Sequence, residues 1–280
     1  MLRWSAIALG FVLLTALSQV GGAVLLATLA VSRWAGRDFG RPTRFALALV
    51  SFAVLHFGVS ELVLPSAAPL LSGRVRLPCQ HDPRSALRPA SQAFCLLNRN
   101  YVTPELRDLA STLAANLRAD KAATTLYYLD GGFPFAAWMP MLPHLGHRDG
   151  RALDLAFLYL DPTTGKPLAG TPSAVGYWAF ERPRGDAADP CPEPAGSWPP
   201  AGRWDLDWLQ PVWGDWRLDE ARTRAMLAWL ATEGPARGVE RIFLEPHLAE
   251  RLGVASPLLR FAGCEAARHD DHVHVEMSRR

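Results

Sequence analysis

The chain has 280 residues, of which 49% are hydrophobic, and a formal net charge of +2 at pH 7. Because nucleic-acid-binding domains carry Lys and Arg well in excess of acids, this near balance gives no electrostatic case for a nucleic-acid partner. The length allows one large domain or two small ones, and the hydrophobic residues are spread unevenly along it.

Residues 4–32 contain no Asp, Glu, Lys, Arg or His. This apolar run exceeds the roughly 20 residues that cross a bilayer core, and it is too long for a cleaved signal peptide. We therefore predict a first transmembrane helix here. Residues 45–64 are a second candidate, which His56 and Glu61 weaken; the alternative is a buried helix of a soluble protein.

The segment between the two apolar runs is basic. It holds four arginines and a single acid, which are Arg33, Arg37, Arg41, Arg44 and Asp38. Short cytoplasmic loops carry an excess of Lys and Arg, so we expect this loop to lie inside the cell and both chain ends outside. Residues 1–66 are thus predicted to be a two-helix transmembrane anchor, and the rest of the chain is expected to face the periplasm or the cell exterior.

Four cysteines follow the second apolar run, namely Cys79, Cys95, Cys191 and Cys264. An even number of cysteines in an oxidising compartment predicts two disulfides, for which three connectivities exist. We favour Cys79–Cys95, which closes a small loop, together with Cys191–Cys264. No Cys-x-x-Cys spacing occurs, so a thiolate zinc site is not expected.

After the anchor, residues 67–94 are a predicted linker rich in Pro, Ser and Arg, and residues 95–280 are a predicted globular domain. Strands and helices are mixed without regular βαβ repetition, which favours an α+β fold. The predicted elements are a helix from residue 103, strands at 124–129, 153–160 and about 177–181, a helix at 218–232, a strand at 241–244, a helix from 245 and a strand at 272–277.

Five of the eight histidines fall in two clusters, and aspartates accompany both. One cluster holds His144, His147, Asp149 and Asp154, and the other holds His269, Asp270, Asp271, His272 and His274. Imidazole nitrogen and carboxylate oxygen are ligands that zinc prefers, and a catalytic site keeps one position open. We therefore predict that the two stretches meet and hold one catalytic zinc ion, with a turn at Gly150 joining a loop histidine to a strand aspartate.

The last cluster is predicted to begin a strand. On a strand, His272 and His274 point to the same face because side chains alternate. Asp271 reaches that face only if the strand begins there or is bulged.

The pattern His-x6-Asp followed far downstream by His-x-His resembles the LAS metallopeptidases, named for lysostaphin, D-Ala-D-Ala peptidases and sonic hedgehog. It is most similar to the penicillin-insensitive murein endopeptidase branch. The resemblance covers about residues 95–280, although its firm motifs are two short segments. It implies an α+β domain with a central antiparallel sheet and a zinc ion held by His147, Asp154 and His274, with His144 as a further candidate ligand.

The same resemblance suggests the catalytic groups. The dipeptidase branches carry an acid three residues before the last ligand, which is Asp271 here, whereas the endopeptidase branch uses histidines, which match His272 and His269. We rank Asp271 slightly ahead of His272 as general base. His272 and His269 are the candidates that stabilise the oxyanion.

The implied function is a membrane-anchored zinc peptidase of the bacterial inner membrane with its catalytic domain in the periplasm. Its substrates would be peptide bonds of peptidoglycan stem peptides or cross-links, between D-alanine and meso-diaminopimelate. The alternatives are a catalytically silent zinc- or peptidoglycan-binding module, an enzyme similar to D-Ala-D-Ala dipeptidases, and a membrane sensor or transporter accessory. The oligomeric state is open.

Overall fold

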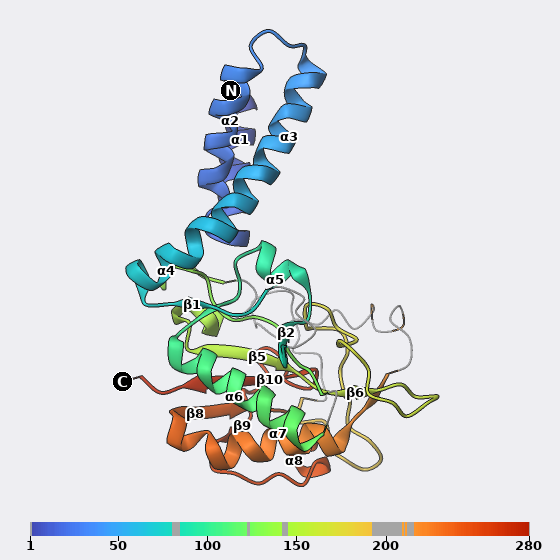
Figure 1. The fold of residues 1–280 in the computed structure, drawn as a ribbon. Coiled ribbons are helices and arrows are strands. Elements are labelled where there is room, and N and C mark those ends of the chain that lie inside the picture. Colours follow the sequence, from blue (N-terminus) through green and yellow to red (C-terminus); the bar gives the residue numbers. More distant parts are fainter. Residues whose placement is uncertain are drawn as a thin grey trace.

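A computed structural model describes residues 2–79, 85–121, 124–141, 145–191, 209, 211 and 216–279. Its N-terminal helices project as a bundle from a domain built around one sheet (Figure 1). The helices of this bundle are α1 (Leu2–Ser18), α2 (Gly21–Ala35) and α3 (Arg41–Gly58), and α3 continues through a π-helical turn, η1 (Val59–Val63), into α4 (Leu64–Ser72).

The first apolar run is divided between α1 and α2, whereas the sequence predicted a single helix there. The chain turns at Gln19, whose φ of 65° is left-handed, and α2 packs back against α1. Glycine allows this close approach, because a Cβ on Gly22 would lie 2.1 Å from the hydroxyl of Thr15 and 2.7 Å from the Phe11 carbonyl. Uniform hydrophobicity hid the turn, whose local signals were Gln19 and the Gly21-Gly22 pair.

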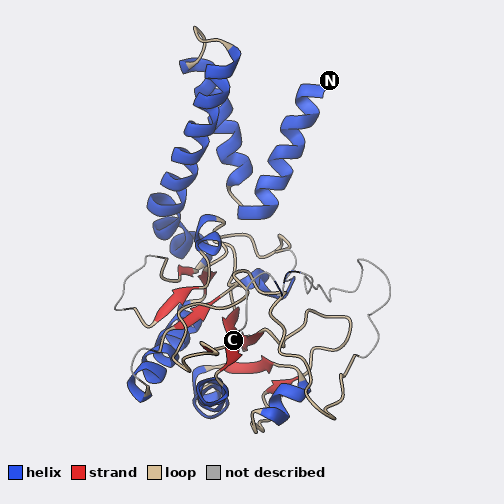
Figure 2. Ribbon diagram, turned by 90° about the vertical axis from the view of Figure 1, so that its right-hand side faces the viewer, coloured by secondary structure: helices blue, strands red, loops and turns tan. Residues whose placement is uncertain are grey.

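Among the described residues, one continuous helical segment, Arg41–Ser72, is long and apolar enough to cross a membrane. Its 32 residues correspond to about 48 Å of helix, against about 30 Å for a hydrocarbon core. The loop at residues 36–40 lies at the end of the bundle remote from the sheet (Figure 1). The N-terminal end of α1 lies at that remote end too, whereas the sequence had predicted both chain ends on one side (Figure 2).

The central sheet has six strands, in the order β2 (Leu87–Pro89), β4 (Leu126–Tyr128), β5 (Ala152–Ala156), β10 (His272–Met277), β8 (Val239–Phe243) and β9 (Leu259–Arg260). The pairs β4–β5, β5–β10 and β10–β8 are antiparallel, but the outer pairs β2–β4 and β8–β9 are parallel. The α+β class is therefore consistent with the structure, whereas the sheet is mixed rather than antiparallel throughout.

Two long helices cover one face of the sheet, α6 (Pro104–Asp120) and α7 (Glu220–Glu233). The Thr103 hydroxyl accepts a hydrogen bond from the Leu106 amide, so the predicted helix start is confirmed. Leu155 and Val273 lie in the core with these helices, which leaves the other face of β5 and β10 for polar side chains.

The remaining elements are short. They are β1 (Val75–Arg76), α5 (Gln92–Leu96), β3 (Tyr101–Val102), η2 (Leu145–Asp149), β6 (Tyr159–Leu160), β7 (Arg217–Leu218), η4 (Pro235–Arg237) and α8 (Pro246–Arg251). The strand predicted at 153–160 is divided between β5 and β6, and residues 177–181 form a loop rather than a strand. The expected linker, residues 67–94, contains β1, β2 and α5, and β2 is an edge strand of the sheet.

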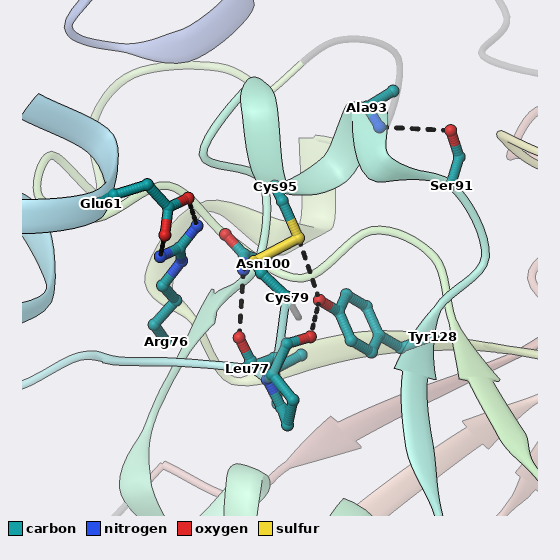
Figure 3. The surroundings of a disulfide bond; sticks show 10 residues. Glu61, Arg76, Leu77, Cys79, Ser91, Ala93, Cys95, Asn100 and Tyr128 are labelled. Atoms are coloured by element: carbon teal, nitrogen blue, oxygen red, sulfur yellow. Dashed lines mark hydrogen bonds and ion pairs between the residues drawn. A yellow bond between two sulfur atoms is a disulfide. The ribbon is translucent and has the colours of Figure 1, made fainter. Parts of the chain in front are cut away.

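Both predicted disulfides, Cys79–Cys95 and Cys191–Cys264, are present. The first lies where the bundle meets the domain, and Figure 3 shows Asn100 and Tyr128 beside it. The Tyr128 hydroxyl donates to the Pro78 carbonyl at 2.7 Å, which ties the chain before Cys79 to β4. This disulfide therefore fastens the segment that leaves the apolar N-terminal helices to the domain.

Candidate metal centre

Three buried side chains from the two predicted clusters converge and could hold a metal ion: His147 of η2, Asp154 of β5 and His274 of β10. His147 Nε2 lies 3.1 Å from His274 Nδ1 and 3.2 Å from Asp154 Oδ1. The His274 Nδ1 to Asp154 Oδ1 distance is 2.8 Å. The expected meeting of the two distant stretches is confirmed.

Strand register explains this convergence. His274 lies directly opposite Asp154 in the antiparallel β5–β10 pair, so both side chains leave the sheet on the face away from the core. Gly150, with a φ of 75°, makes the turn that brings His147 of η2 back over Asp154. A turn of this kind at Gly150 was predicted.

Hydrogen bonds determine which nitrogen of each ring faces the centre. His147 Nδ1 lies 2.7 Å from the Gly131 carbonyl, which can only accept, so Nδ1 carries the proton and Nε2 presents its lone pair. His274 has the opposite tautomer. Its Nε2 carries the proton and donates to Glu276 Oε1 at 3.3 Å, so its Nδ1 presents the lone pair on the side of Asp154. Sequence reasoning missed Glu276, although it follows His274 by two residues on the same strand face.

The donor set fits a zinc ion. Ligands at 2.0–2.1 Å in tetrahedral geometry lie about 3.3 Å apart, close to the spacings found here. Burial lowers the pKa of His274, but hydrogen bonds with Asp154 and Glu276 outweigh it, so that pKa lies above its usual value. The two carboxylates that favour a proton on His274 would equally favour a bound cation.

His272 and Asp271 form a second layer beside these ligands. The strand β10 begins at His272, one residue later than a start at Asp271 would require, so Asp271 precedes the strand and its side chain is not bound by the strand's alternation. His272 Nδ1 donates to Asp271 Oδ1, and Asp271 Oδ2 accepts from the backbone amide of Tyr177. His272 Nε2 then lies 3.6 Å from Asp154 Oδ1.

The loop that holds Asp271 is conformationally unusual. Gly176 and Tyr177 both have left-handed φ values, 78° and 85°, and such a value is uncommon for tyrosine. A Cβ on Gly176 would lie 3.7 Å from Asp271 Oδ2. The left-handed turn brings the Tyr177 amide onto the carboxylate, which is a structural reason for this backbone to persist.

His269 completes the histidine cluster. Its ring centroid lies 5.1 Å from that of His272 and 5.5 Å from that of His274, and the ring stacks on Phe243. Its backbone amide donates to Glu245 at 3.3 Å. The structure therefore brings His269 to the same site as the ligands.

The sequence offered three further candidates, His144, Asp149 and Asp270. His144 falls outside the described residues. Asp149 pairs with Arg151, and Asp270 pairs with Arg268, so neither aspartate orients a ligand imidazole through these contacts. Burial raises the pKa of Asp270, although the hydrogen bond from Arg268 opposes this shift.

Compared with models of known protein families, the chain matches none. A comparison with curated proteins also finds no match. The fold and the site thus define the protein only as an α+β domain with a buried His–Asp–His group that could hold a metal ion, carried on apolar N-terminal helices.

Proposed function

We propose that the chain is a membrane-anchored zinc peptidase that hydrolyses peptide bonds of peptidoglycan, in the manner of the LAS peptidases that its motifs resemble. The observation that carries the proposal is the convergence of His147, Asp154 and His274 with the Asp271–His272 pair beside them. Two oriented imidazoles and one carboxylate leave room for a further position, as catalytic zinc sites do.

When bound, zinc would supply Lewis-acid chemistry, lowering the pKa of the attacking water and polarising the scissile carbonyl. The chain's own residues then move the proton. His272 takes it at Nε2, because its Nδ1 already donates to Asp271. Asp271 orients the ring and stabilises the imidazolium, while both its oxygens are occupied. This assignment exchanges the roles ranked from sequence, where Asp271 came first as base.

The same histidine is suited to return its proton to the leaving amine, since one group commonly serves as base and then as acid. His269, packed against His272 and His274, is proposed as the donor that stabilises the developing oxyanion. Its position beside both rings supports this role.

The anchor and the disulfides support the proposed setting. The basic residues around the α2–α3 loop lie at the end remote from the sheet, which by the positive-inside rule would be cytoplasmic. The domain would then face the periplasm of a bacterial inner membrane, an oxidising compartment that suits two disulfides. There it would lie next to peptidoglycan, whose D-alanyl–meso-diaminopimelate cross-links are the proposed substrate.

The test uses the full chain in detergent, with metal content measured beside digestion of purified cross-linked muropeptides. Wild type should hold one zinc per chain and cleave, and His274→Ala should lose both. His272→Ala should keep the zinc but lose about 10²–10⁴-fold in kcat, the usual contribution of a general base. A matched control is His247→Gln, a buried histidine that contacts the Glu181 carbonyl outside the site, which should keep both properties.

Two results would overturn the proposal. Zinc without cleavage of any stem peptide or cross-link would instead favour a binding module. No stoichiometric metal in the wild type would rule out the zinc peptidase itself.

A further inference from the structure

Residues 131–136, here called the strap, connect the metal centre to the membrane helices. At one end of the strap, the Gly131 carbonyl accepts the hydrogen bond of 2.7 Å from His147 Nδ1. This bond holds the ring of a candidate ligand in the tautomer that turns Nε2 toward Asp154. The position of the strap therefore determines the direction in which His147 points.

The strap is closely packed where it passes His147. The Gly131 amide donates to the Arg99 carbonyl at 2.8 Å, and the Gly132 carbonyl accepts from the Tyr101 amide at 2.9 Å. A Cβ on Gly132 would lie 2.7 Å from the Tyr101 carbonyl oxygen and 3.0 Å from that of His147. This stretch thus has little room to move independently of His147.

Two residues at the end of the long membrane helix hold the middle of the strap. The Ser72 hydroxyl donates to the Pro134 carbonyl at 2.6 Å. Arg74, only 3% exposed, donates to the Phe133 carbonyl and, at 2.7 Å, to the Arg148 carbonyl. Its guanidinium therefore joins the strap to η2, the two segments that together place His147.

The turn between α1 and α2 holds the far end of the strap. Gln19 Oε1 accepts from the Phe135 amide at 2.7 Å, and Gln19 Nε2 donates to the Ala136 carbonyl at 3.3 Å. The side-chain amide thus pairs with the backbone as a neighbouring strand would. The left-handed backbone of Gln19 places this side chain at the tip of the α1–α2 hairpin, against the domain.

We infer that the membrane helices are a structural part of the metal centre, in which Gln19, Ser72 and Arg74 are positioning residues for His147. In this arrangement, three carbonyls and one amide of the strap are fixed by residues of the anchor or its exit. Displacement of the helices would remove these four contacts and leave the strap held through Gly131 and Gly132, where it supports His147. Metal affinity therefore depends on the docked position of the anchor. The inference rests on the proposed metal site.

The test compares Gln19→Gly with His56→Ala in the full chain in detergent. Glycine tolerates the left-handed backbone of residue 19, so this variant removes the side-chain clamp without straining the turn. His56→Ala removes another bond between a membrane helix and the domain, from His56 Nε2 to the Leu96 carbonyl at 2.7 Å, which does not involve the strap. Zinc affinity is measured by competition with a chromogenic chelator, and the visible spectrum of the cobalt-loaded chain reports the coordination geometry.

Gln19→Gly should weaken zinc binding about tenfold, at the lower end of the effect of residues that support ligands, and should change the cobalt spectrum. His56→Ala should bind like the wild type. Arg74→Lys, which cannot bridge two carbonyls in the same way, should weaken binding in the same direction while keeping the charge. A melting temperature that falls equally in Gln19→Gly and His56→Ala would show that stability alone does not produce the difference in affinity.

If the wild type binds zinc and both Gln19→Gly and Arg74→Lys bind it equally well with unchanged cobalt spectra, the inference is overturned while the proposed function stands. A wild type that binds no zinc would instead overturn both.

Discussion

The strand pair β5–β10 and the helix pair α1–α2 are both antiparallel, but they are specified in different ways. Residues far apart in sequence form β5–β10, and its alternation of core leucines and valines with His and Asp defines two faces. Neighbouring residues form α1–α2, and their sequence is apolar on every side. Alternation therefore reveals geometry over a long distance, whereas uniform hydrophobicity hides even a local turn.

The largest effect is expected on the core face of the strand pair. Val273 is fully buried between the two site residues His272 and His274. Val273→Asp would bury a charge among apolar side chains. We therefore expect the free energy of unfolding to fall by more than about 4 kcal/mol, so that the domain fails to fold. Leu96→Asp also introduces an aspartate, but at a side chain that is 53% exposed, and it should change the unfolding free energy by less than about 0.5 kcal/mol. Denaturant unfolding measures both, and a folded Val273→Asp chain would contradict the assignment of faces.

The next effect concerns the junction between the two regions. Cys79–Cys95 has a sequence separation of 16 and lies where the chain leaves the apolar N-terminal helices. Replacing both cysteines by serine should lower the free energy of unfolding by about 3 kcal/mol, since a crosslink of this length restricts the unfolded chain by that amount. Unfolding of the double variant under oxidising conditions, beside the wild type with and without reductant, measures the effect. Equal stability of all three would show that this disulfide does not stabilise the junction.

The helix pair offers a test of the turn itself. A side chain at Gly22 would collide with Thr15 and Phe11, whereas a Cβ on Gly58 meets nothing within 4 Å. Gly22→Leu should therefore destabilise the bundle by about 1–3 kcal/mol, the usual cost of overpacking, and Gly58→Leu should not. Thermal unfolding in detergent measures the difference. If residues 4–32 were one continuous span, both substitutions would be tolerated, so an equal outcome would restore the simpler anchor.

Much of the site could be predicted because its residues belong to short patterns of fixed geometry. The His-x-His alternation predicted that His272 and His274 share a face, and the β5–β10 register then placed Asp154 opposite His274. The partners of these groups could not be predicted, because they are backbone atoms of distant loops, such as the Gly131 carbonyl and the Tyr177 amide. Backbone groups leave no residue-type signal in a sequence.

In the fold, too, local features could be predicted and long-range pairings could not. Helix starts with a capping residue and the strand at 272–277 were predicted closely, since their signals are local. The mixed sheet was not predicted, because parallel pairing of β2 with β4 depends on where Leu87–Pro89 docks after the apolar N-terminal helices. Nothing in the Pro- and Arg-rich composition of that segment indicates a strand.

The smallest effect tests one such local signal. Thr103→Ala removes the hydroxyl that accepts a hydrogen bond from the Leu106 amide at the start of α6. The free energy of unfolding of the domain should therefore fall by about 1 kcal/mol. Asp219→Ala removes a cap of α7 that also pairs with Arg222 at 2.5 Å, so its loss should be larger because a buried guanidinium is left behind. Capping propensity alone separates Thr and Asp only slightly, whereas the Arg222 contact in the structure ranks Asp219 clearly higher. Denaturant unfolding of both variants decides between these rankings, and equal losses would mean that the tertiary contact adds nothing to the local signal.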